Sequence, residues 1–205
     1  MKPGKPGINL FWKGSMDMLF KSMDISAPES KGSADSIKLE TAFKFLDGRK
    51  LNQISHNIGR LESDISIFFK TDGAWSAIDL IEYLLQQTGA ADIYFSTWSI
   101  GPEALRYYSH WLNSGLVKSA VGIIDEGFRN RKPDLYHQAI NTFSSLKFSK
   151  SHAKVTVIKG DNLSLTLMGS ANLTRNPRTE VGVIIVNDDL AQSNINWIME
   201  GVANV

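Results

Sequence analysis

The sequence predicts an α/β fold in which a mixed, mostly parallel sheet carries helices on both faces. Two observations lead to this prediction. From about Arg60 onward, short apolar segments typical of strands alternate with longer segments whose apolar residues recur at helical spacing. Later in the chain, two strongly alternating segments, 154–158 and 163–168, flank a Gly-Asp-Asn turn, which indicates a hairpin inside the sheet.

The expected elements follow one another in a regular order. A strand over 66–70 precedes the turn Asp72-Gly73, and a helix is expected over 74–87 because its apolar residues are spaced by three and four. Gly101-Pro102 begins the next helix, since proline is tolerated in a first turn. The remaining elements are strands over 92–96, 117–124, 146–148 and 180–186, the two hairpin strands, and helices over 101–115, 133–143 and 190–199.

Residues 1–58 have a different composition from the rest of the chain. Residues 26–36 are rich in Ser, Gly, Pro and charge, as linkers are, and a short apolar patch over 10–20 precedes them. Residues 37–45 can form a short helix or a strand. We therefore predict an N-terminal extension over 1–58, able to dock a protein partner, and a folded domain over 59–205.

Composition excludes several classes of protein. The 205 residues are 42% hydrophobic and 21% charged, which is enough apolar material for a sizeable core. The absence of cysteine excludes disulfides, thiolate zinc sites and a cysteine nucleophile. The sequence has no apolar run long enough to span a membrane and no secretory signal pattern, so we expect a cytoplasmic protein.

Positive charge is concentrated in one part of the chain although the whole has a net charge of only +1. Residues 127–179 contain nine Lys and Arg against two Asp, whereas residues 60–126 contain four basic and nine acidic residues. Such a segment is typical of a surface that binds phosphate or a polyanion. The alternative is a solvated face whose cations protect the hairpin edges from aggregation.

The most specific pattern comprises His152 and Lys154 at the first hairpin strand and Ser170 and Asn172 after the second. Residues two apart on a strand face the same side, and a hairpin returns its second strand to the end where the first began, so these four side chains can converge. A lysine and an amide can hold the oxygens of a phosphoryl group while an imidazole attacks phosphorus. Glu180 can orient His152 through its other ring nitrogen. Alternatively, Ser170 and Asn172 close a turn and Glu180 is an edge charge.

The pattern His-x-Lys, followed by Gly-Ser-x-Asn and a later Glu, resembles the motif of the phospholipase D superfamily, H-x-K-x4-D-x6-G-S-x-N. The resemblance covers about residues 65–205 and implies a phospholipase D-like catalytic domain of the single-motif, nuclease-like branch. It implies catalytic roles for His152, Lys154, Ser170, Asn172 and Glu180. The sequence departs from the motif in two ways: Lys159 stands where the family has Asp, and the hairpin is longer, with Asp161 as a displaced counterpart.

The resemblance also implies a mechanism that requires neither metal nor cofactor. One histidine attacks to form a phosphohistidine, and another protonates the leaving oxygen and later activates water. The chain has one copy of the motif, and His56, His110 and His137 lie outside such a setting. The second histidine is therefore expected from a second copy of the chain in a symmetric homodimer.

Several residues near the motif are candidates for substrate contact. Lys150, Arg175 and Arg178 are predicted to bind substrate because they flank the motif and are basic. Trp98 follows a predicted strand and can either line the cleft or pack in the core.

The expected function is that of a phosphodiesterase, a metal-independent endonuclease acting on DNA or RNA. A lipid or small-headgroup phosphodiesterase is a weaker hypothesis because nothing in the sequence resembles an interfacial helix. The alternative from another class is a catalytically inactive phospholipase D-like module that assembles into a nucleic-acid-processing, phage or mobile-element complex through residues 1–58. Mutation of His152 distinguishes the enzyme from the module.

Overall fold

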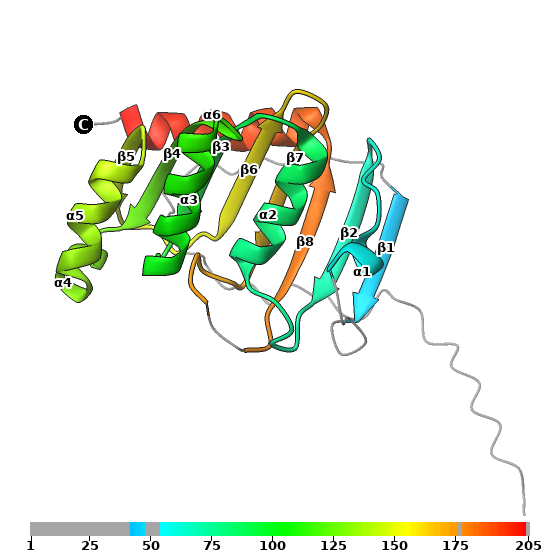
Figure 1. Ribbon diagram of the computed structural model, residues 1–205, viewed down its shortest axis with the longest axis horizontal. Coiled ribbons are helices and arrows are strands. Elements are labelled where there is room, and N and C mark those ends of the chain that lie inside the picture. Colours follow the sequence, from blue (N-terminus) through cyan, green and yellow to red (C-terminus); the bar gives the residue numbers. More distant parts are fainter. Residues whose placement is uncertain (1–41, 48–53, 176–177, 204–205) are drawn as a thin grey trace, which may run out of the picture. The chain divides into compact units, whose positions relative to one another are not determined.

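An eight-stranded mixed sheet forms the centre of the protein in the computed structural model, which describes residues 42–47, 54–175 and 178–203 (Figure 1). The strands are β1 (Ala42–Asp47), β2 (Ile65–Lys70), β3 (Ala91–Thr97), β4 (Val117–Asp125), β5 (Ser145–Ser149), β6 (Val155–Gly160), β7 (Ser164–Gly169) and β8 (Val181–Val186). The helices are α1 (Ile54–Ile58), α2 (Ala77–Thr88), α3 (Pro102–Ser114), α4 (Phe128–Arg131), α5 (Pro133–Thr142) and α6 (Asp188–Ala203).

The strand order across the sheet is β1-β2-β8-β7-β6-β3-β4-β5. The pairs β1–β2, β3–β4 and β4–β5 are parallel. The pairs β2–β8, β8–β7, β7–β6 and β6–β3 are antiparallel. β6 and β8 therefore run against the other described strands, which all share one direction. The predicted mixed sheet is confirmed. Six of the eight described strands share one direction, as expected of a mostly parallel sheet, but four of the seven strand pairs are antiparallel, and these lie together in the middle.

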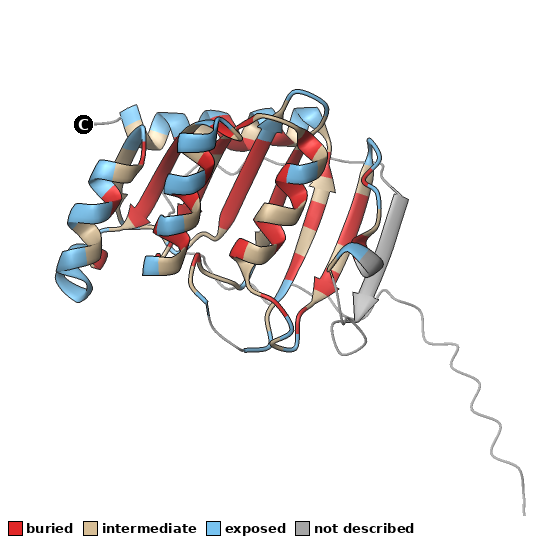
Figure 2. Ribbon diagram, viewed as in Figure 1, coloured by how far each residue is buried: buried red, intermediate tan, exposed pale blue. Residues whose placement is uncertain are grey.

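Helices cover both faces of the sheet, as predicted. α2 and α3 pack on one face, where Ile93, Phe95 and Ile158 belong to the larger apolar core. α6 packs on the other face, where Val157 joins a smaller cluster with Ile198. The central strands are consequently buried on both sides, and the exposed residues lie on the outer helix surfaces and at the two edges where strands end (Figure 2).

The predicted hairpin is confirmed as β6 and β7, which pair in antiparallel register around the turn that follows Gly160. The helix predicted from residue 74 begins later, at Ala77, because Ser76 and Asp79 form a capping box that fixes the start of α2. Residues 42–47 form a strand, one of the two alternatives for that segment. The short helices α1 and α4 were not predicted, since five and four residues are too few to show a periodic pattern.

The chain divides into a unit of residues 1–36 and a unit that begins at Ile37 and includes the whole sheet. The predicted boundary at residue 59 falls inside the second unit, because β1 pairs with β2 and Ile58 is buried in the core. The predicted linker over 26–36 and apolar patch over 10–20 lie outside the described residues. In the part of the chain that is described, no helix is both long and apolar enough to cross a membrane.

Candidate active site

The motif residues lie at one edge of the sheet, the lower edge in Figure 1, where β3, β4, β5 and β7 end and where β6 and β8 begin. In sheets of this kind, ligands bind outside the carboxyl ends of the strands, since the loops there leave room and direct polar groups outward. His152 and Lys154 immediately precede β6, Ser170 and Asn172 immediately follow β7, and Glu180 immediately precedes β8.

His152 and Lys154 lie on an extended segment just before β6 rather than within the strand, because pairing with β3 and β7 begins only at Val155. A hydrogen bond of 2.8 Å between the hydroxyls of Ser96 and Ser151 fixes this segment to the end of β3. Lys154 Nζ donates to the carbonyl oxygen of His152 at 2.9 Å and lies 3.3 Å from His152 Nδ1. The two side chains meet as predicted, and the imidazole is exposed.

Lys154 is half-buried, and this burial lowers the pKa of its ammonium group, an effect that the negative charge of Glu180 opposes. Burial disfavours a charged group that has lost its water. Among the described residues, Lys154 forms no ion pair within contact distance of a carboxylate. An anion bound at this position would therefore meet a cation that has already lost part of its hydration.

Ser170 and Glu180 form a second part of the site. Ser170 Oγ donates a hydrogen bond to the Glu180 carboxylate, and Val181 N donates to Ser170 Oγ at 3.1 Å. Gly169 permits this close approach, since a Cβ at that position would lie against the carbonyl oxygen of Val181. Glu180 is held further by Thr71 of the segment after β2, whose Oγ1 accepts from Glu180 N at 3.1 Å and whose N–H donates to Glu180 O at 2.8 Å.

Among the described residues, Glu180 does not hydrogen-bond to His152 as predicted. Its carboxylate is turned toward Ser170 instead. The side chain beside the His152 ring nitrogen Nδ1 is Lys154 instead. A role for Glu180 in orienting His152 remains a prediction.

Asn172 is placed by the end of β3. Its side-chain oxygen lies 3.5 Å from Thr97 Oγ1, which also accepts from Leu173 N at 3.4 Å and donates to the carbonyl of Ser99 at 2.9 Å. Gly101 N donates to Leu173 O at 2.8 Å and so joins the segment after β7 to the start of α3. The sequence analysis did not predict Thr97 as part of the site. A signal existed, since a buried polar residue at the carboxyl end of a central strand is well placed to hold a site residue by hydrogen bonds.

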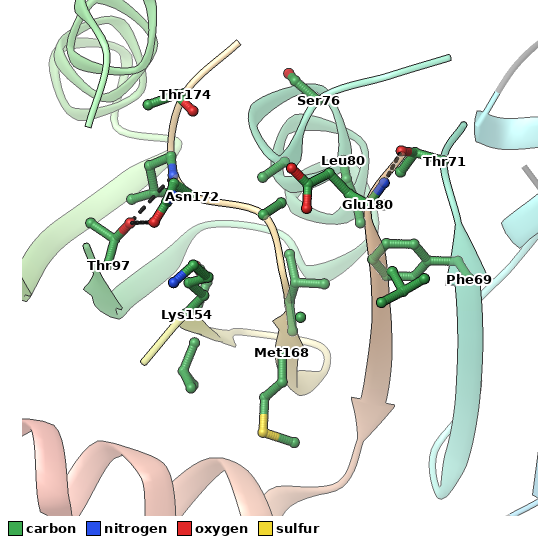
Figure 3. A pocket seen from close by; sticks show the side chains of 18 of the residues that line it. Phe69, Thr71, Ser76, Leu80, Thr97, Lys154, Met168, Asn172, Thr174 and Glu180 are labelled. Atoms are coloured by element: carbon green, nitrogen blue, oxygen red, sulfur yellow. Dashed lines mark hydrogen bonds between the residues drawn. The ribbon is translucent and has the colours of Figure 1, made fainter. Parts of the chain in front are cut away.

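A pocket lies between these groups. Lys154, Asn172 and Thr97 line one side of it, and Glu180 lies across from Lys154 (Figure 3). Phe69 and Leu80 add apolar walls from β2 and α2. His152 and Ser170 are not among its lining residues, so the imidazole is at the exposed surface next to the pocket rather than inside it.

Trp98, for which the sequence allowed two positions, lies beside His152, with the two ring centroids 6.0 Å apart. The guanidinium carbon of Arg131 lies 4.1 Å from the centroid of the Trp98 ring, and Arg131 donates to the Trp98 carbonyl at 3.1 Å. Arg131 also pairs with Asp125 at the end of β4, at 2.9 Å. The sequence analysis missed Arg131, whose contribution depends on α4, a helix too short to be predicted.

The three basic residues predicted to bind substrate are not gathered around Lys154. Arg175 pairs with Glu103 of α3 at 2.6 Å and is 69% exposed. Arg178 is exposed, and its carbonyl oxygen accepts from Thr71 Oγ1 at 3.2 Å. Lys150 is exposed and follows the end of β5. Their role in binding substrate remains a prediction.

The two residues that depart from the motif lie at the opposite end of the hairpin. Lys159 Nζ donates to Gln192 Oε1 at 3.0 Å, and Asp161 pairs with Lys118 at 2.5 Å. Neither residue contacts His152, Lys154, Ser170 or Asn172 among the described interactions. Within the same part of the chain, no group of three or more His, Asp or Glu residues is arranged to hold a metal ion.

No protein-family model matches the sequence, and a search of curated proteins found no match. Among solved structures, the chain is similar to a phospholipase D family member, Nuc from Salmonella typhimurium, at 19% sequence identity. That similarity covers 58% of this chain and 85% of the other, with a TM-score of 0.47.

Proposed function

We propose that this chain is a phosphodiesterase of the nuclease type, which hydrolyses DNA or RNA through a phosphohistidine intermediate. The observation that carries the proposal is the placement of Lys154 at one edge of the sheet, where it contacts the exposed His152 and lines a pocket together with Asn172. Lys154 can neutralise a non-bridging phosphate oxygen. Because Asn172 turns its side-chain oxygen toward Thr97, its NH2 group is left to donate to another oxygen.

In the proposed reaction, Nε2 of His152 is the nucleophile and must hold the free lone pair, so Nδ1 carries the ring proton and donates it to an acceptor, the role predicted for Glu180. Lys154 Nζ, which lies 3.3 Å from Nδ1, then donates to the carbonyl oxygen of His152. Nε2 forms a bond to phosphorus while the bond from phosphorus to the leaving oxygen breaks, and that oxygen takes a proton from a second acid. A water molecule then gives a proton to the same group and attacks phosphorus. The nitrogen–phosphorus bond breaks, the phosphate monoester leaves, and the imidazole is restored.

The second acid in this proposal is His152 of a second copy of the chain. The exposure of His152 supports this arrangement, because a two-fold symmetric partner could bring its own imidazole to the same phosphate. The other histidines whose side chains are described, His110 and His137, lie on the exposed surfaces of α3 and α5. In this arrangement one imidazole is neutral and attacks, while the other carries the proton that it gives to the leaving oxygen.

The remaining predicted residues have supporting roles in this proposal. Ser170 and Glu180 hold the segment after β7 against β8 and thereby position Asn172. Lys150, Arg175 and Arg178 contribute positive charge around the site. Residues 1–58 supply a surface for a protein partner.

The test compares the wild-type chain with His152→Ala and, as a matched control, His137→Ala, an exposed histidine on α5. Hydrolysis of bis(p-nitrophenyl) phosphate, plasmid DNA and single-stranded DNA is measured with EDTA present. We expect activity in wild type and in His137→Ala, and a loss of at least about 10³-fold in His152→Ala. Activity that survives in His152→Ala contradicts the proposal. If the wild-type chain cleaves none of these substrates, the inactive binding module becomes the better account.

The dimer is tested by mass measurement and by mixing subunits. A mixed dimer of wild type and His152→Ala has only one of the two histidines, so adding excess mutant should reduce the activity of a fixed amount of wild type. A monomeric mass, or activity unaffected by excess mutant after subunit exchange, contradicts a shared site.

A further inference from the structure

A second cleft adjoins the candidate active site, between the start of α3, the start of α5 and the segment after β7. Its volume is about 530 Å³, within the range of small-molecule sites. The polar residues that matter in it are Glu103, Arg106, Lys132 and Arg175. The motif does not include this cleft, and the chemistry proposed above does not use it.

The charge of the cleft is positive. Three of these four side chains are cations, and the one anion, Glu103, is already engaged by Arg175 at 2.6 Å. Arg106 and Lys132 are exposed and form no ion pair among the described residues. An anion entering the cleft would therefore meet two cations that no carboxylate compensates.

The cleft adjoins the pocket. Thr174 lines both the cleft and the pocket that contains Lys154 and Asn172. The cleft is also lined by Ser99, the residue after Trp98, whose ring lies beside His152. A chain of linked anionic groups that enters the pocket at Lys154 would therefore find a second group of cations beside it, past Thr174.

We propose that this cleft binds a neighbouring phosphate of the polynucleotide strand whose scissile diester is held at His152, Lys154 and Asn172. The inference rests on the proposed function and adds a second phosphate contact, at Arg106 and Lys132, outside the residues that perform the chemistry. A phospholipid or small diester with a single phosphate fills only the site, whereas a nucleic-acid strand places phosphates at regular intervals and engages both. Arg106 and Lys132 then contribute affinity that is independent of base sequence.

The test removes the two cations together in Arg106→Ala/Lys132→Ala. The matched control, Lys118→Ala/Lys159→Ala, removes two exposed lysines at the opposite edge of the sheet. Binding of a fluorescein-labelled single-stranded DNA is measured by anisotropy at several salt concentrations, with EDTA present. Hydrolysis of bis(p-nitrophenyl) phosphate, which has one phosphate, is measured in parallel.

For the cleft variant we expect DNA affinity to fall about tenfold, and the slope of log K against log salt to shrink by about 1, as loss of phosphate contacts predicts. Hydrolysis of the small diester should be unchanged, and the control variant should bind DNA like wild type. As a variant of opposite sign, Glu103→Gln removes the anion and should tighten DNA binding. Equal loss of affinity in the cleft and control variants overturns the inference, as does a wild-type chain that binds no DNA.

The two proposals fail in different measurements. If the chain hydrolyses nothing but still binds DNA through Arg106 and Lys132, the phosphodiesterase proposal is wrong and the cleft is a nucleic-acid site of a binding module. If it hydrolyses the small diester through His152 while the cleft variant binds DNA like wild type, the enzyme stands and the cleft has no part in substrate binding.

Discussion

The two ends of the β6–β7 hairpin carry similar side chains in different surroundings. At the turn end, Lys159 contacts Gln192 and Asp161 pairs with Lys118, and all four side chains are reached by solvent. At the open end, Lys154 is half-buried and lies against His152 with no paired carboxylate among the described residues. A partly desolvated cation with no carboxylate in contact is unfavourable unless an anion binds there. On the proposed function, the open end is therefore the place for a phosphate, and the turn end is ordinary surface.

The largest effect should come from exchanging the lysines at the two ends for methionine, which keeps the length of the side chain. Lys154→Met removes the cation that we place on the phosphate oxygen and should lower kcat/KM by about 10²- to 10³-fold. Lys159→Met removes an exposed charge at the far edge and should leave kcat/KM within about twofold of wild type. The measurement is the steady-state kcat/KM of both variants on bis(p-nitrophenyl) phosphate. An equal loss of kcat/KM in the two variants would show that the two ends of the hairpin do not differ in function.

A second pair of variants compares two buried threonines, Thr97 at the site and Thr166 in the middle of β7. Thr97 Oγ1 has three polar neighbours, whereas Thr166 Oγ1 is buried and has no hydrogen-bond partner in the described part of the chain. Thr97→Val should therefore lower the free energy of unfolding by about 1 kcal/mol and reduce activity through Asn172, and Thr166→Val should leave stability unchanged or raise it by up to about 1 kcal/mol. The free energy of unfolding of both variants is measured in urea. A larger loss of stability in Thr166→Val than in Thr97→Val would contradict the expectation.

A third effect is the pH dependence of Lys154. Burial lowers its pKa from the ordinary value of 10.5, so the ammonium loses its proton earlier as pH rises. The activity that depends on this charge should begin to fall below pH 10.5, whereas Lys154→Arg, whose guanidinium stays charged, should not show that fall.

The stability contribution of Lys154 should change in the opposite direction over the same pH range. The folded state binds this proton more weakly than the unfolded state does, so the group's contribution to stability rises as pH passes from the folded pKa toward the unfolded one. An activity profile of wild type that matches Lys154→Arg throughout would show that Lys154 does not carry the charge that matters.

The smallest effect is expected from the ion pair at the turn end. Lys118 and Asp161 are both about half-exposed, and pairs of this kind contribute little because water screens them. Asp161→Asn should leave the unfolding midpoint and the hydrolysis rate unchanged within error. A clear loss of activity would mean that Asp161 acts on the site from the far end of the strand, as a displaced counterpart of the motif's Asp.

The sequence analysis predicted the residues of the hairpin ends because their geometry is local. A two-residue spacing and a tight turn are enough to bring Lys154 and Asn172 to the same edge of a sheet. Thr71 and Thr97 could not be predicted in the same way, since Thr71 contacts Glu180 across 109 residues and Thr97 contacts Asn172 across 75. The contact of Arg131 with Trp98 depends on where α4 lies, and a helix of four residues is too short to show a periodic pattern in the sequence.

The hydrogen bonds between Thr71 and the residues that lead into β8 have a consequence for the order of events during synthesis. Contacts between residues so far apart along the chain carry the entropy cost of closing a long loop, so we expect them to form after the local contacts. A growing chain that has emerged only as far as Asn172 already contains the histidine and the lysine, but it lacks Glu180 and the strand that holds the segment after β7 in place. On the proposed function, a ribosome translating this protein would therefore carry no working nuclease beside its own RNA until β8 has been made.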